Sequence, residues 1–194
     1  MITNIESKLK FIELVDDMKN IERAIRLRNG REETNAEHSY HLAMMVIIFA
    51  DDFPKLNILR SVKLALLHDI VEIFAWDTVI FDKKMEKTKD ERESNALLEL
   101  EQILWKEYFS EYKELIEDYI NVASIESEFV HQMDKFQPIM QIVMQWWDSW
   151  HEYKIDKKML LEKKYSQIND KFWLMKILNR YFEKAERKNM FYIK

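Results

Sequence analysis

Glycine and proline are almost absent from this chain, which has one glycine and two prolines in 194 residues. Tight turns between strands generally need both residue types, glycine for positive φ angles and proline for its fixed φ. Eleven methionines and six tryptophans supply side chains that fill the irregular gaps between packed helices. The composition therefore predicts an all-α protein, and the length favours a single domain over residues 1–194.

Apolar spacing divides the chain into expected helices. Residues 5–28 form the first, which ends before Gly30 because glycine tolerates the positive φ of a helix C-terminus. A polar loop at 31–35 precedes a second helix at about 36–52, and a third helix carries residues 64–77. The further expected elements are a charged loop or short turn at 81–89 and helices at 90–109, 110–123, 125–151, 157–165 and 168–188.

Charge and composition limit the function classes. The formal net charge of −5 argues against a general nucleic-acid binder. The absence of cysteine leaves no disulfide framework and no thiol chemistry. The N-terminal residues contain no apolar signal region, and no uncharged apolar run approaches bilayer length. These observations predict a soluble, cytoplasmic protein that contacts no membrane.

The expected third helix combines the most apolar run of the chain with several ionisable groups. Leu-Ala-Leu-Leu at 64–67 is followed at once by His68 and Asp69, and Glu72 and Asp77 come soon after. On a continuous helix, Glu72 would share a face with His68 one turn further along. A buried carboxylate beside an imidazole costs several kcal/mol unless a partner charge or a metal ion compensates. This stretch is therefore a candidate functional site.

Two other segments place similar groups in apolar surroundings. His38 falls in the first turn of the expected second helix with His41 one turn later, and an almost wholly apolar run follows. Far downstream, Asp134 has apolar neighbours, and Pro138 leaves the Asp134 carbonyl without its helical N–H partner. That missing hydrogen bond allows either a plain bend or an opening of the helix toward a ligand.

Each of these residues also has a structural interpretation. A lone buried histidine is more often a hydrogen-bonded core residue than a ligand, and Asp134 by itself reads as a surface acid of a helix. Together, however, a histidine at a helix start, a His-Asp pair on a buried helix and a distant aspartate form a specific combination. Mixed imidazole and carboxylate groups suit a divalent ion such as Mn²⁺, Fe²⁺, Co²⁺, Zn²⁺ or Mg²⁺.

At these residues the sequence resembles the HD-domain phosphohydrolases, whose name comes from a His-Asp doublet, here His68-Asp69. It is most similar to the branch of small bacterial members that includes 5′-deoxynucleotidases acting on deoxyribonucleoside monophosphates. The resemblance covers about residues 20–140, with C-terminal helices at about 141–190. It rests on four segments in the order His, His-Asp, Asp: 36–43, 67–72, 77–78 and 134–138.

The resemblance implies a fold, a cofactor and a substrate. The fold is an HD-type helical bundle, the cofactor is one divalent metal ion, and the substrate is a small phosphoester, a nucleoside 5′-monophosphate. Glu72 and Asp77 would be acid–base or water-orienting carboxylates, Arg23 would contact the phosphate, and the protein would be a homodimer. The four implied metal ligands are His38, His68, Asp69 and Asp134.

The sequence departs from the family pattern at two positions. Trp76 stands where the family usually has a glycine before the acid, and Ala24 stands where some nucleotidases have an aromatic after the arginine. Trp76 could supply a wall of the substrate site that Ala24 cannot, or it could simply pack against a neighbouring helix. The phosphate role of Arg23 has alternatives too, either a surface ion pair or one of three other arginines: Arg26, Arg28 and Arg31.

Three other functions compete with a monophosphatase. The same site could hydrolyse another phosphoester, such as a nucleoside polyphosphate or a cyclic nucleotide. A non-catalytic module that binds a nucleotide or a protein is a second alternative, which retention of all four ligands with Glu72 and Asp77 argues against. A third is a structural helical dimer with Trp146, Trp147 and Trp150 at its interface, although those tryptophans suit a core better.

Overall fold

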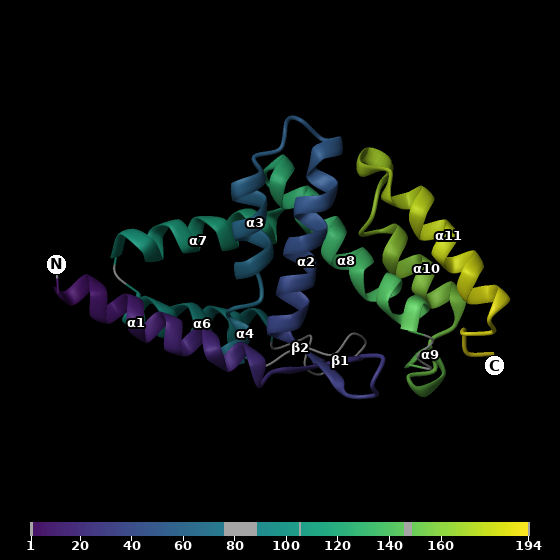
Figure 1. Ribbon diagram of the computed structural model, residues 1–194, viewed down its shortest axis with the longest axis horizontal. Coiled ribbons are helices and arrows are strands. Elements are labelled where there is room, and N and C mark those ends of the chain that lie inside the picture. Colours follow the sequence, from purple (N-terminus) through teal and green to yellow (C-terminus); the bar gives the residue numbers. More distant parts are fainter. Residues whose placement is uncertain (1, 76–88, 105, 146–148, 194) are drawn as a thin grey trace.

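The computed structural model describes residues 2–75, 89–104, 106–145 and 149–193 of the chain. Helices dominate this part of the molecule, together with one two-stranded antiparallel sheet, and the prediction of an all-α fold is confirmed (Figure 1). Short 3₁₀ helices occupy Asp17–Lys19, Ala50–Asp52 and Asp170–Phe172. The strands and α-helices, in chain order, are α1 (Ile2–Asp16), β1 (Glu22–Arg26), β2 (Glu32–Thr34), α2 (Asn35–Phe49), α3 (Ile58–Leu67), α4 (Glu72–Ala75), α6 (Lys89–Ile103), α7 (Lys106–Asn121), α8 (Ile125–Gln145), α9 (Ser149–Glu152), α10 (Lys157–Tyr165) and α11 (Leu174–Arg187).

Helices α2 and α3 stand at the centre of an elongated molecule (Figure 1). Both pack against the long helix α8, which crosses behind them, and α3 also packs against α7. Helices α1, α6 and α7 extend toward one end of the molecule, while α10 and α11 cover α8 at the other. The middle of the molecule is therefore where three segments far apart in sequence meet.

The described part of the core forms two apolar clusters. The larger cluster joins α2, α3 and α8 to α10 and α11 and includes Val46, Leu64 and Phe129, each almost inaccessible to solvent. The smaller cluster joins α1, α6 and α7 to the residues that follow α3 and includes Ile70 and Leu100. The partly buried Leu67, the last residue of α3, packs against both clusters.

The expected helix over residues 5–28 is wrong in its second half. Helix α1 ends at Asp16, and β1 follows at Glu22–Arg26, paired with β2 so that Glu22 faces Thr34 and Arg26 faces Glu32. Gly30 has a φ of 89°, but it turns the hairpin and does not end a helix. A hairpin turn and a helix C-terminus both favour a glycine with positive φ, and isoleucines four residues apart lie on one face of a strand as well as of a helix. The sequence spacing therefore did not distinguish a hairpin from a longer helix.

Apart from the stretch at 64–77, the other expected helices are found, most of them with shifted ends. The helix at 157–165 has the expected limits, and the expected helix at 125–151 is described in two parts, α8 up to Gln145 and the short α9 that carries Trp150. Trp150 is buried and stacks on Phe191 with ring centroids 4.9 Å apart, as expected of a core residue. Trp146 and Trp147, and all of the loop expected at 81–89 except Lys89, lie outside the described residues.

Within the described residues, no helix combines the length and apolar character needed to cross a bilayer. The organisation of residues 1–194 as a single domain stays a prediction.

Candidate metal centre and adjoining cavity

The first candidate ligand, His38, is fixed by the start of α2. Thr34 caps the helix by accepting a hydrogen bond from the Glu37 N–H, and the Glu37 carboxylate accepts one from the Thr34 N–H. This reciprocal capping satisfies backbone donors that the first helical turn leaves unpaired. It sets the rotation of the first turn, which points the His38 side chain inward, where it is fully buried.

The second and third candidate ligands lie in a turn and not within a helix. Helix α3 ends at Leu67, and α4 begins only at Glu72. Between them the backbone bonds reach back three residues, from the Ile70 N–H to the Leu67 carbonyl and from the Glu72 N–H to the Asp69 carbonyl. The prediction of one helix through 64–77, with Glu72 a regular turn after His68, is therefore wrong.

Four side chains from three distant segments converge on one point. The His38 Nε2 lies 3.1 Å from Asp134 Oδ1 and 3.7 Å from Asp69 Oδ2. The His68 Nε2 lies 3.1 Å from Asp69 Oδ2 and 3.9 Å from Asp134 Oδ1. The structure thus brings together all four predicted ligands, and ligand atoms of His38, His68 and Asp69 lie within 4.8 Å of one another.

The hydrogen bonds of the two imidazoles favour metal binding. His38 donates its Nδ1–H to Gln137 Oε1 at 3.1 Å, and His68 donates its Nδ1–H to the Ala65 carbonyl at 3.1 Å. With Nδ1 as the donor in both rings, each Nε2 faces the two carboxylates. Both Nε2 atoms are buried, and neither makes a hydrogen bond with the described residues. These atoms therefore fit a cluster that could bind a divalent metal ion.

The charges around the cluster keep its carboxylates ionised. Burial raises the pKa of Asp69, but His68 and Arg23 outweigh burial and hold that pKa below its usual value. Burial likewise opposes ionisation of Asp134, whereas Lys135 and His38 hold the Asp134 pKa well below its usual range. Burial lowers the pKa of His38 to about 4, so this imidazole is neutral at neutral pH. Anionic carboxylates and a neutral imidazole are the forms that bind a metal.

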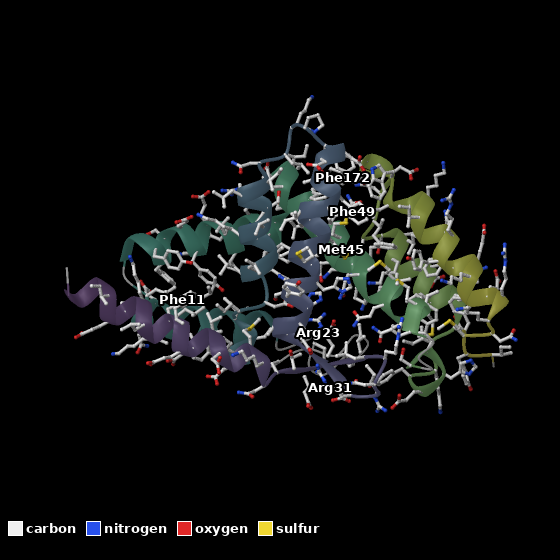
Figure 2. The ribbon with its side chains drawn as sticks, viewed as in Figure 1. Phe11, Arg23, Arg31, Met45, Phe49 and Phe172 are labelled. Carbon is white, nitrogen blue, oxygen red and sulfur yellow. The ribbon has the colours of Figure 1, made fainter. Side chains whose placement is uncertain are left out.

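Arg23 touches the cluster through Asp69. Its Nη1 donates to Asp69 Oδ2 at 2.9 Å and to Asn35 Oδ1 at 3.1 Å, and its Nε lies 3.7 Å from Glu33. Figure 2 shows Arg23 near the lower end of α2, with Arg31 further out on the hairpin. The three other candidate arginines contact surface residues or solvent. Arg26 pairs with Glu32 and Glu152. Arg31 pairs with Glu37, and Arg28 is exposed.

Glu72, the predicted catalytic carboxylate, is buried beside this arginine. It accepts a hydrogen bond from Asn35 Nδ2, and Asn35 in turn accepts from Arg23. Asn35 therefore joins Glu72 to the arginine that holds Asp69. The other two predicted site residues, Trp76 and Asp77, lie outside the described residues.

A buried polar network behind His38 was missed by the sequence analysis. Gln137 accepts from His38, and its Nε2, which has two N–H donors, lies 2.8 Å from Gln141 Oε1, 3.1 Å from His41 Nδ1 and 3.4 Å from Glu33 Oε1. Burial raises the pKa of Glu33, although hydrogen bonds from the two glutamines and the charge of Arg23 oppose that increase. His41 is thus part of the hydrogen-bonded support of His38 and does not join the cluster. The position of Gln137 three residues after Asp134 was the available signal.

A cavity of about 280 Å³ opens on the other side of the cluster. His68, Asp69 and Asp134 form its charged end. Tyr119 donates its hydroxyl to Asp134 Oδ2 at 2.9 Å, and burial together with Asp134 holds the Tyr119 pKa well above its usual value. The other residues lining the cavity, which the sequence analysis did not single out, are Val71, Leu97, Ile116, Ile120, His131 and Lys135.

A sequence model of the HD domain family matches residues 15–176, which include the hairpin and all four convergent residues. The chain belongs to the HD domain family. The family assignment made from the sequence is confirmed, and its extent is larger than the expected 20–140.

Relatives of this HD domain protein include nucleotidases and a phosphohydrolase. The human 5′-deoxynucleotidase HDDC2 is 34% identical over 137 residues, covering 70% of this chain and 66% of that protein, just under two thirds of its length. The 5′-deoxynucleotidase hdd1 of Schizosaccharomyces pombe is 27% identical and covers 89% of this chain and 82% of its own length. A crystal structure of a predicted metal-dependent phosphohydrolase from Magnetospirillum magnetotacticum superimposes with a TM-score of 0.85, at 26% identity, covering 98% of this chain and 96% of that chain.

Lys164 gives this HD domain a pH-dependent stability. Its buried Nζ donates to the Lys135 carbonyl at 2.9 Å, and burial followed by the charge of Lys135 lowers the pKa of Lys164 from 10.5 to about 7. Between these two pKa values the unfolded chain binds one proton that the folded chain does not, so the free energy of unfolding rises with pH. We expect wild type to gain about 3 kcal/mol relative to Lys164→Met between about pH 7.5 and pH 9.5.

Urea unfolding of both proteins at the two pH values measures this difference. Lys63→Met removes an exposed lysine that pairs with Glu111 on the surface, and it serves as the matched control. A difference between wild type and Lys164→Met that is equal at both pH values would contradict the assignment.

Proposed function

We propose that this chain is a metal-dependent phosphohydrolase that converts deoxyribonucleoside 5′-monophosphates to nucleosides and phosphate. The observation that carries the proposal is the pair of buried Nε2 atoms without hydrogen bonds, which point at two ionised carboxylates beside a cavity. The relatives named 5′-deoxynucleotidase support the substrate, and the similar phosphohydrolase structure supports the reaction class.

In this proposal one divalent ion is held by four side chains, as the resemblance implied: His38, His68, Asp69 and Asp134. The ion would supply Lewis-acid stabilisation of negative charge on the phosphoryl oxygens. Gln137 and Ala65 keep the two imidazoles in the required tautomer, and Arg23 orients Asp69. This set of imidazole and carboxylate ligands suits Mn²⁺, Co²⁺, Zn²⁺, Fe²⁺ or Mg²⁺.

The acid–base work is assigned to Glu72 or Asp77, as the resemblance implies. The oxygen of the attacking water bonds to phosphorus and its proton passes to this carboxylate, while the P–O5′ bond breaks and the leaving O5′ receives a proton from the same carboxyl group. Arg23 remains the predicted phosphate contact, although in this structure its guanidinium contacts Asp69 and Asn35. Trp76 remains a predicted wall of the substrate site. A homodimer in the cytoplasm, without contact to nucleic acid or membrane, likewise stays a prediction.

Phosphate release tests the substrate class directly. Purified protein with added Mn²⁺ or Co²⁺ should release phosphate from deoxynucleoside monophosphates faster than from the matching ribonucleotides. The same protein treated with a chelator is the control, and it should release none. Inactivity toward all monophosphates combined with cleavage of a nucleoside triphosphate or a cyclic nucleotide would show that the substrate assignment is wrong.

A further inference from the structure

The cavity beside the four convergent residues is lined by two chemically different sets of side chains. One end carries His68, Asp69 and Asp134, and other parts of the wall consist of aliphatic side chains. A ligand that fills it would place a charged group near the cluster and a carbon-rich group against the wall. The aliphatic residues of the wall are Val71, Leu97, Ile116 and Ile120.

A negatively charged group at this end needs a cation, and Arg23 is not among the residues that line the cavity. Its guanidinium is bound to Asp69 and Asn35. Among the described residues that line the cavity, Lys135 is the one that is a lysine or an arginine. Lys164 lies deeper and donates to the Lys135 backbone.

The geometry of Lys135 suits an anion that also approaches the cluster. Its Nζ lies 2.6 Å from Asp134 Oδ2, while the other oxygen of the same carboxylate faces the His38 Nε2 at 3.1 Å. The ammonium group is therefore separated from the cluster by the width of one carboxylate. An ammonium has three N–H donors, and the hydrogen bond to Asp134 uses one of them.

Contacts on both sides hold this arrangement in place. The Tyr119 hydroxyl donates to the same Oδ2 of Asp134, and Lys164 donates to the Lys135 carbonyl. The Lys135 side chain keeps 29% of its surface exposed, so its ammonium group can still meet a ligand. A fixed backbone with an accessible ammonium group is what a preorganised phosphate contact requires.

We propose that Lys135 binds the phosphoryl group of the substrate inside this cavity, with the organic part of a phosphomonoester against the aliphatic wall. The inference rests on the proposed phosphohydrolase function and adds to it a phosphate contact besides the predicted Arg23. Lys135 shares its ammonium group between Asp134 and a phosphoryl oxygen.

Inorganic phosphate is the probe that tests this role without turnover. Lys135→Met, loaded with Mn²⁺, should bind phosphate about tenfold or more weakly than wild type in calorimetric titration, the usual effect of losing a charged hydrogen bond. Lys135→Arg should recover part of the affinity, because it keeps the positive charge. For a phosphomonoester, KM should rise more than kcat falls. Lys63→Met, which removes a surface lysine paired with Glu111, should behave as wild type.

Metal content separates phosphate binding from a structural role. If Lys135 only held Asp134 in place, Lys135→Met would lose bound Mn²⁺ in elemental analysis, and this result would overturn the proposal. Unchanged phosphate affinity in Lys135→Met would also overturn it, even if the wild type hydrolyses monophosphates. Conversely, if wild type binds phosphate through Lys135 but hydrolyses no monophosphate, the phosphate site stands and the proposed function fails.

Discussion

Asp69→Ala should lose nearly all bound divalent metal. Asp69 Oδ2 lies 3.1 Å from the His68 Nε2 and 3.7 Å from the His38 Nε2, so its carboxylate is shared by both imidazoles. Removing it takes away one ligand charge and releases Arg23 from its 2.9 Å contact beside the cluster. The cluster would then lack one anionic ligand, while Arg23 stays nearby with its Nε 3.7 Å from Glu33, and its positive charge opposes the binding of a further positive ion.

Elemental analysis after dialysis measures this loss, and wild type should retain about one ion per chain, the stoichiometry expected of a single four-ligand site. Asp118→Ala is the matched control, since Asp118 is also a buried aspartate bound to an arginine, Arg60 at 2.6 Å, but lies outside the cluster. It should keep its metal. Asp69→Asn, which preserves side-chain shape, guards against unfolding as the cause. Unchanged stoichiometry in folded Asp69 variants would exclude this metal site.

Glu72→Ala should reduce kcat by roughly a hundredfold or more, the usual worth of a general base, while the bound metal stays. Glu72 is not one of the four convergent residues. Its carboxylate accepts a hydrogen bond from Asn35, which accepts one from Arg23, and Arg23 also donates to Asp69. It is therefore placed to affect proton transfer more than metal binding. Phosphate-release kinetics at saturating substrate, together with elemental analysis, give both quantities.

Glu126→Ala provides the comparison for Glu72, because the two glutamates are equally exposed at 9% and Glu126 accepts from the Asn57 N–H away from the cluster. Glu126→Ala should keep the turnover number of wild type. A Glu72→Ala enzyme with a normal rate would instead assign proton transfer to Asp77.

The convergent residues could be predicted from the sequence because their chemistry conflicts with their surroundings. His38, His68 and Asp134 each stand in an apolar segment, and such a conflict is visible without any knowledge of the fold. The structure then places both imidazoles within 3.7 Å of Asp69 and within 3.9 Å of Asp134. Their roles in catalysis stay predictions.

The supporting residues could not be predicted in the same way. Gln137 and Glu33 are polar residues whose burial depends on partners about 100 positions away in the chain. Apart from the position of Gln137 three residues after Asp134, the local sequence carries no signal for such pairs. The hairpin was missed because its two strands are short and its apolar residues also fit a helix. The turn after Leu67 was missed because its residues continue a helical apolar pattern, while the backbone changes to three-residue hydrogen bonds.

The division of the core into two apolar clusters has a consequence for stability. The cavity takes Val71 and Ile116 from the smaller cluster and lies against Asp134 on α8, the helix at the centre of the larger one. Leu67, which packs against both, leads directly into the turn that carries His68 and Asp69. Two clusters of this kind can open as separate cooperative units, each with its own hydrogen-exchange protection. A ligand that spans the cavity couples the unfolding of the two clusters. Occupancy of the site should therefore slow amide exchange in α6 and α7, which contribute Leu97 and Ile116 to the cavity wall but none of the four candidate ligands.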